Sequence, residues 1–171
     1  RVSSDPGRTR LVNFFRVSGV PKPGGRGAGE PYFVDLPGYG YAKASREIRE
    51  SFEALVVSYL LDREPLRLCV FIVDARHEPS DRDQVLRAWL EEHALPYLVA
   101  ANKIDALSRG EANRRVAALG RGPLSGGQAV LGVSAERGTG IEDLWNAIRG
   151  AAFAAPDPGA EAPERRGNDG R

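Results

Sequence analysis

The most specific chemical pattern in the chain is Asn102-Lys103-Ile104-Asp105, which directly follows an apolar run. The Asp105 carboxylate can accept hydrogen bonds from the ring N–H and the exocyclic amine of guanine, a pair of donors that adenine lacks. Asn102 would support the base and its neighbouring loop, and the aliphatic stem of Lys103 can lie along the ring. The alternative is a solvated surface turn. The pattern uses one of only three lysines in the chain, which favours guanine binding.

A second pattern, Val34-Asp35-Leu36-Pro37-Gly38, places a carboxylate at a predicted strand end, followed by a tight glycine turn. This arrangement suits a Mg²⁺ and phosphate site. Asp35 would hold the metal through a water molecule, and the Gly38 amide would donate to a γ-phosphate. D-x-x-G is a weak signal by itself, and its alternative interpretation is an ordinary strand-to-turn transition.

A third pattern, Val133-Ser134-Ala135, closes the last predicted strand. The small Ser-Ala turn would let backbone amides reach the carbonyl oxygen of the base. This signal gains meaning from its position, because a strand–helix crossover fits between Asp35 and Asn102 and another between Asn102 and Ser134.

The elements that must position these residues alternate between strands and amphipathic helices, which is the pattern of an α/β sheet. Strands are expected at 10–17, 32–35, 68–73, 97–101 and 129–133. The continuous apolar run at 68–73 predicts a strand buried on both faces, with Cys69 in the core. Residues 18–31 hold five glycines and three prolines and are expected to form a loop.

Four helices are expected, and three of them begin at recognisable capping residues. Their predicted starts are Ser45, Ser80 with Asp83, Ser108 with Glu111, and Thr139 with Glu142. The residues expected to face inward are Ile48, Phe52, Leu55, Val56 and Tyr59 on the first helix, and Val85, Leu86, Trp89 and Leu90 on the second.

Composition bounds the possibilities. The 171 residues, 42% of them hydrophobic, suffice for one domain, and the formal net charge of +1 points to no nucleic acid or acidic membrane partner. No apolar run is long enough to cross a bilayer. A single cysteine fits a reducing cytoplasm. We expect one domain at 1–153 and a disordered tail at 154–171.

Several longer runs resemble the EngB family of bacterial GTPases. They are Ser3-Ser4-Asp5-Pro6-Gly7-Arg8-Thr9, Asn13-Phe14-Phe15, Asp35 to Ala42, and Asp74 to Pro79. The resemblance covers roughly residues 1 to 150. It implies a mostly parallel P-loop GTPase sheet with helices on both faces, GTP or GDP as ligand, and Mg²⁺. It also implies a cytoplasmic monomer that serves large ribosomal subunit assembly and normal cell division, with the large subunit or its precursor (rRNA and ribosomal proteins) as partner.

The same resemblance assigns roles to residues that spacing alone does not. Thr9 would be the switch threonine whose hydroxyl ligates Mg²⁺, and Asp35 to Gly38 would lead into the second switch. The first switch, which also contacts the nucleotide, would comprise Gly7, Arg8, Thr9, Arg10 and Leu11. No residue is a convincing general base, and this class of enzyme works mostly by positioning and charge stabilisation. Tyr39 stands where many GTPases place a water-orienting glutamine, which predicts slow intrinsic hydrolysis that the ribosomal particle accelerates.

The pattern breaks at the phosphate loop. A GTPase of this type needs G-x-x-x-x-G-K-[ST], and the chain contains no Gly-Lys pair and no methionine. We therefore expect an N-terminally incomplete GTPase domain that lacks the first strand, the phosphate-binding loop and the first helix. The strands that end at Asp35 and Asp74 would lose the neighbour between them.

Two other functions remain open from the sequence. The chain could be a nucleotide-free interaction module on a degenerate GTPase scaffold, although such a module has no need for the guanine-selecting motif. It could also be an Era-like GTPase with a different cellular role.

Overall fold

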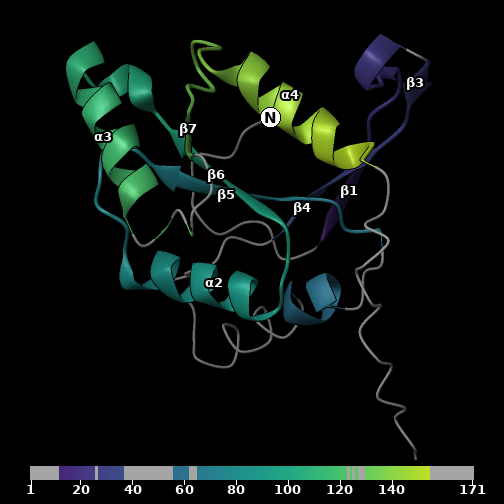
Figure 1. Ribbon diagram of the computed structural model, residues 1–171, viewed down its shortest axis with the longest axis horizontal. Coiled ribbons are helices and arrows are strands. Elements are labelled where there is room, and N and C mark those ends of the chain that lie inside the picture. The colour runs from purple at the N-terminus through teal and green to yellow at the C-terminus, as the bar shows by residue number, and fades with distance from the viewer. Residues whose placement is uncertain are drawn as a thin grey trace, which may run out of the picture.

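The structure, a computed structural model, describes residues 12–25, 27–36, 56–61, 65–122, 124, 126 and 130–154. Figure 1 shows strands running between helices, with α2 on one side and α4 on the other. The strands are β1 (Asn13–Arg16), β2 (Val20–Pro21), β3 (Ala28–Gly29), β4 (Tyr32–Asp35), β5 (Cys69–Asp74), β6 (Tyr97–Asn102) and β7 (Val130–Gly132). The helices are α2 (Asp81–Glu92), α3 (Arg109–Arg121) and α4 (Ile141–Ala152), with 3-10 turns η1 (Pro23–Gly25) and η2 (Ile104–Ala106).

The best-packed part of the molecule is the parallel sheet β5-β6-β7, which confirms three of the predicted strands. Phe71 and Val73 of β5 and Val99 of β6 point into a core that α2 and α3 cover, with Leu90 and Leu119 as the main helical contributions. Cys69 packs against this core, and burial raises the pKa of its thiol to about 11. The cysteine is therefore a core residue, as expected.

Helix α2 begins at the predicted Ser80, where the structure shows a capping box. The Ser80 hydroxyl accepts from the Asp83 amide, and the Asp83 carboxylate accepts from the Ser80 amide at 2.8 Å. Leu90 is 2% exposed, and Leu86 and Trp89 pack against the core. The prediction that Val85 faces inward is wrong, since its side chain is 57% exposed. Val85 lies one position before Leu86, so the helix turns it away from the face that meets the sheet.

The first predicted strands pair antiparallel, β1 with β4, with Phe14 opposite Val34 and Phe15 opposite Phe33. Phe14 contacts Tyr59 of the helical segment 56–61, with ring centroids 5.8 Å apart. Phe33 meets Trp145 of α4 at 5.5 Å. The expected loop at 18–31 contains a short ladder between β2 and β3, closed by η1.

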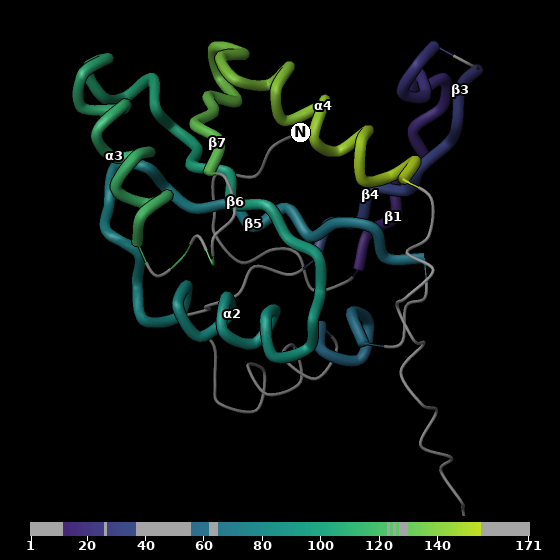
Figure 2. Tube along the Cα trace, viewed as in Figure 1, coloured from purple at the N-terminus to yellow at the C-terminus, as the bar shows by residue number. Residues whose placement is uncertain are grey.

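No hydrogen-bonded ladder joins β4 to β5 among the residues that the structure describes. Figure 2 shows β4 beside β1, and β5 beside β6. The separation agrees with the predicted loss of a strand between Asp35 and Asp74. The prediction that β5 is buried on both faces is wrong, because Ile72 is 63% exposed whereas Val73 is 7% exposed.

Helix α4 starts one residue later than the predicted capping box requires. Gly140 is the N-cap with φ of 72°, and Thr139 makes no side-chain cap. A Cβ at position 140 would lie 2.2 Å from the Gly132 carbonyl oxygen, so the chain passes too close to β7 for any other residue. At α3 the predicted cap is present, because the Ser108 hydroxyl accepts from the Glu111 amide.

Some predictions lie outside the described residues. These include the helix start at Ser45 with Ile48, Phe52 and Leu55, and the tail except for Ala154. Across the described ranges, no helix is both long enough and apolar enough to span a bilayer.

Candidate functional site

The predicted guanine-selecting residues meet at one edge of the parallel sheet, where β6 and β7 end. Asn102 is the last residue of β6, and Ile104 and Asp105 lie in the η2 turn that follows it. Ser134 follows β7 and is fully buried. The Ile104 amide donates to the Val133 carbonyl at 3.3 Å and so fastens the two loops together. Two segments separated by a whole helix therefore lie side by side, as the spacing predicted.

The Asn102 side chain is the bridge between these loops. Its Oδ1 accepts from the Lys103 amide at 2.8 Å and from the Ala135 amide at 3.2 Å. The first bond helps to hold Lys103 in the left-handed conformation, with φ of 68°, which L-residues rarely adopt. The Ser134 amide donates to the Thr139 carbonyl at 2.8 Å. The Ala135 amide makes the longer of the two hydrogen bonds to Asn102, so this amide could also donate to the carbonyl oxygen of a bound base.

Asp105 is tied to the β7 loop through Ser134. The Ser134 hydroxyl accepts from the Arg137 amide at 3.0 Å. Hydrogen bonding to Ser134 is the main cause of an Asp105 pKa below its ordinary value, and the positive charges of Arg137 and Arg76 act in the same direction. An ionised carboxylate in this position accepts hydrogen bonds only, as guanine recognition requires.

The structure adds two residues that our sequence analysis did not assign to the site, Asp74 and Arg76. Asp74 ends β5 and lies in register with Asn102. Its Oδ2 accepts from Lys103 Nζ at 2.9 Å, and Arg76 holds the same carboxylate through Nε and Nη2. The two cations, Arg76 first, keep the pKa of Asp74 well below its ordinary range. The sequence feature that could have identified both residues is the run from Asp74 to Pro79, which resembles EngB proteins.

Of the residues predicted to bind phosphate and metal, the structure describes only Asp35 and Leu36. Asp35 is exposed at the end of β4, and Leu36 follows it half-buried. Gly7, Arg8, Thr9, Arg10, Leu11, Pro37 and Gly38 lie outside the described residues. Where the structure is described, no group of three His, Cys, Asp or Glu side chains could hold a metal ion. An exposed carboxylate at Asp35 still fits Mg²⁺, which takes oxygen ligands and retains several waters.

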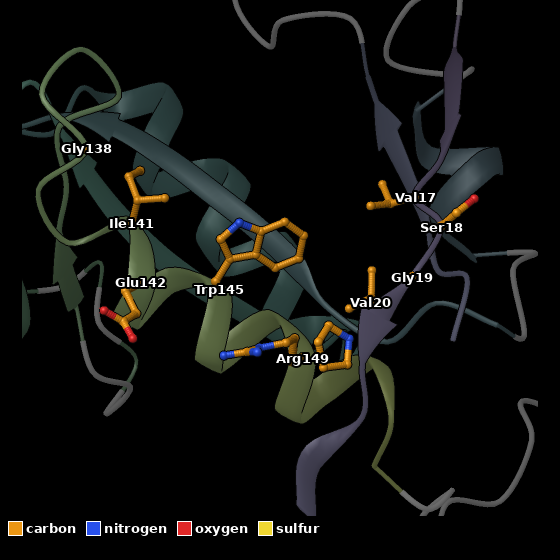
Figure 3. A pocket seen from close by; sticks show the side chains of 10 residues that line it. Val17, Ser18, Gly19, Val20, Gly138, Ile141, Glu142, Trp145 and Arg149 are labelled. Atoms are coloured by element: carbon orange, nitrogen blue, oxygen red, sulfur yellow. The ribbon is translucent and has the colours of Figure 1, made fainter. Parts of the chain in front are cut away.

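A groove of about 570 Å³ lies between α4 and the segment that leads into β2. Figure 3 shows Trp145 projecting from α4 toward Val17 and Val20, with Arg149 at the same wall. The predicted site residues do not line this groove.

Known proteins match the chain over most of its length. Residues 1–103 match the family described as 50S ribosome-binding GTPase. A protein named Probable GTP-binding protein EngB, from Anaeromyxobacter sp. (strain Fw109-5), is 48% identical over 171 aligned residues. That alignment covers 98% of this chain and 76% of the relative.

Solved structures agree on the fold. A crystal structure of a probable GTP-binding protein engB superposes with a TM-score of 0.58 at 21% identity, covering 71% of this chain and 76% of that one. Era in complex with MgGDPNP and part of 16S ribosomal RNA gives a TM-score of 0.67 at 21% identity, covering 91% and 49%. At this identity the likeness concerns the fold alone.

Proposed function

The chain belongs to the EngB family of GTPases, and from that premise we propose that it binds and hydrolyses GTP during assembly of the large ribosomal subunit. The observation that supports the proposal is the assembled base site, in which the loops after β6 and β7 are joined by the Ala135 amide to Asn102 Oδ1 and by the Ile104 amide to the Val133 carbonyl. A site organised before its ligand arrives loses little freedom on binding.

Guanine selection follows from the direction of these hydrogen bonds. The Asp105 carboxylate, whose pKa is lowered by Ser134 and nearby arginines, would face a ligand as a hydrogen-bond acceptor. Guanine presents two hydrogen-bond donors to this carboxylate, whereas adenine would present an acceptor, which the carboxylate would repel. The half-exposed stem of Lys103 would lie along the ring, and the Ala135 amide would donate to the base oxygen.

The phosphate and metal half of the proposal rests on Thr9, Asp35 and Gly38. Thr9 would ligate Mg²⁺ directly and Asp35 through water, while the Gly38 amide would donate to the γ-phosphate. Bound Mg²⁺ would neutralise charge on the phosphates. Tyr39 cannot orient water as glutamine does, so we expect slow hydrolysis that the large subunit or its precursor accelerates.

The cellular part of the proposal is an interaction with rRNA and ribosomal proteins in the cytoplasm, by a monomer needed for normal cell division. A family described as 50S ribosome-binding GTPase supports the choice of partner. Stimulation of GTP turnover by purified large subunits tests it directly. A turnover rate that large subunits leave unchanged would count against the ribosomal role and leave GTP binding intact.

A second candidate is a nucleotide-free interaction module. The observation in its favour is that the 171 residues contain no G-x-x-x-x-G-K-[ST] loop to hold the phosphates. Against it stands the guanine-selecting motif Asn102-Lys103-Ile104-Asp105, for which a module that binds no nucleotide has no need.

Fluorescent GDP with Mg²⁺, competed separately by GTP and ATP, distinguishes the two candidates. The titration is run on this chain and on a longer form that carries the phosphate loop upstream of Arg1. We expect GTP but not ATP to compete, with tighter binding by the longer form. Failure of both forms to bind guanine nucleotide would refute the GTPase proposal and favour the interaction module.

A further inference from the structure

Asp74 contacts the base site without belonging to any of the three predicted nucleotide motifs. It is the last residue of β5 and pairs in register with Asn102, the first residue of the guanine-selecting motif. The Ala75 amide donates to the Asn102 carbonyl at 2.8 Å and extends the ladder one step beyond the strands. The backbone therefore fixes the Asp74 Cα directly beside the turn that presents Lys103.

The Asp74 side chain is held in one orientation. Its Oδ1 accepts from the Arg76 amide at 3.0 Å and from Arg76 Nε at 2.9 Å, and its Oδ2 accepts from Arg76 Nη2 at 2.7 Å. This is a paired contact between a planar guanidinium and a carboxylate, which is geometrically specific. The remaining capacity of Oδ2 is directed to Lys103 Nζ at 2.9 Å.

Lys103 needs such an anchor. Its backbone is in the left-handed region, its side chain is half exposed, and a lysine stem has many rotamers of similar energy. The contact to Asp74 is the salt bridge that the structure gives for its ammonium group. Fixing the far end of the stem before the base arrives removes part of the entropy cost of binding.

We propose that Asp74, itself oriented by Arg76, is a positioning residue that holds the Lys103 stem ready to lie along the guanine ring. The inference rests on the proposed function and adds a third chain segment to the base site. Asp74 touches no part of the nucleotide in this arrangement and acts through Lys103 alone.

A double-mutant cycle on GDP affinity tests the proposal, using Asp74→Asn, Lys103→Met and the double variant, in the form of the protein that binds GDP. Methionine keeps an apolar stem and removes the charge. We expect Asp74→Asn to weaken GDP binding about fivefold, the upper range for a partly exposed ion pair. In the Lys103→Met background the same change should have no effect. An equal effect in both backgrounds, or tighter binding by Asp74→Asn, would overturn the proposal.

A nucleotide-free measurement separates this inference from the proposed function. With only three lysines, acetylation of Lys103 can be followed by mass spectrometry, with Lys22 and Lys43 as internal references. Asp74→Asn should raise the relative labelling rate of Lys103. Glu78→Gln is the matched control, because Glu78 lies in the same loop but pairs with Arg115 of α3.

The outcomes are distinct. Faster Lys103 labelling in Asp74→Asn, without GDP binding by any form, would confirm the contact but refute both the proposed function and a role in base binding. GDP binding with labelling that Asp74→Asn leaves unchanged would overturn the positioning role and leave the GTPase proposal standing. Thermal unfolding of each variant checks that the fold is retained.

Discussion

The two halves of the molecule differ in how they pack their apolar residues. On one side, β5, β6 and β7 share a core with α2 and α3, and side chains such as Val99 are fully buried. On the other side, α4 has a clear apolar face, yet none of its residues is fully buried. Phe15 and Tyr32 on the β1-β4 pair are exposed. The border between the two halves runs along β5, where no ladder reaches β4 in the described part of the chain.

This difference separates the two tasks of a nucleotide site. The proposed base-selecting residues lie at the end of the well-packed half, where hydrogen bonds from the Ala135 amide to Asn102 and from the Ile104 amide to Val133 join their two loops. The proposed metal residue Asp35 ends a strand of the other half. Base recognition therefore has a rigid support, whereas phosphate recognition depends on parts that the described residues do not supply.

The largest expected effect comes from truncating a leucine in each half. Leu90→Ala should destabilise the protein by about 3 kcal/mol, because it opens a cavity in the core. Leu144→Ala, the matched change on α4, should cost only about 1 kcal/mol, because the side chain is half-buried. Urea unfolding measures both. Equal costs would show that the two halves are equally well packed and would break the comparison.

The second effect tests whether the well-packed half determines base choice. Asp105→Asn replaces one acceptor oxygen with a donor amide, so it should lower GDP affinity about a hundredfold by losing a charge-assisted acceptor. The same variant should bind xanthosine diphosphate more tightly than the unchanged protein does, since xanthine offers a carbonyl where guanine has its amine. Competition titrations give both affinities. A variant that loses GDP without gaining the xanthine nucleotide would mean that Asp105 supports the fold and does not read the base.

Local patterns in the sequence predicted most of the elements, and they predicted that the proposed base-site residues would lie together. Ser80 and Ser108 cap helices as expected, and Asn102, Asp105 and Ser134 come together because parallel strands end at one edge. The failures have tertiary causes. Thr139 does not cap α4 because Gly140 must pass close to the Gly132 carbonyl. Asp74 was not assigned to the site because its contact with Lys103 bridges two strands, and no short motif encodes it.

The smallest expected effect tests the border between the two halves, by truncating neighbouring residues that lie on opposite faces of β5. Val73→Ala should cost about 2 kcal/mol, since its side chain is 7% exposed and contributes to the core. Ile72→Ala removes more atoms but should change stability by less than about 0.5 kcal/mol, because the 63% exposed side chain leaves few contacts to lose. Urea unfolding measures the free energy of unfolding of both variants, and each serves as the control for the other because they lie on the same strand.

The same pair tests whether the exposed face of β5 is covered when the phosphate loop is present. In the longer form proposed for GDP binding, a strand beside β5 and the helix that follows it would bring apolar contacts to Ile72. The cost of Ile72→Ala should then rise to at least about 1 kcal/mol, while that of Val73→Ala stays the same. An unchanged cost at Ile72 would show that the added segment lies elsewhere. The gap between β4 and β5 would then belong to the fold and would not mark a missing strand.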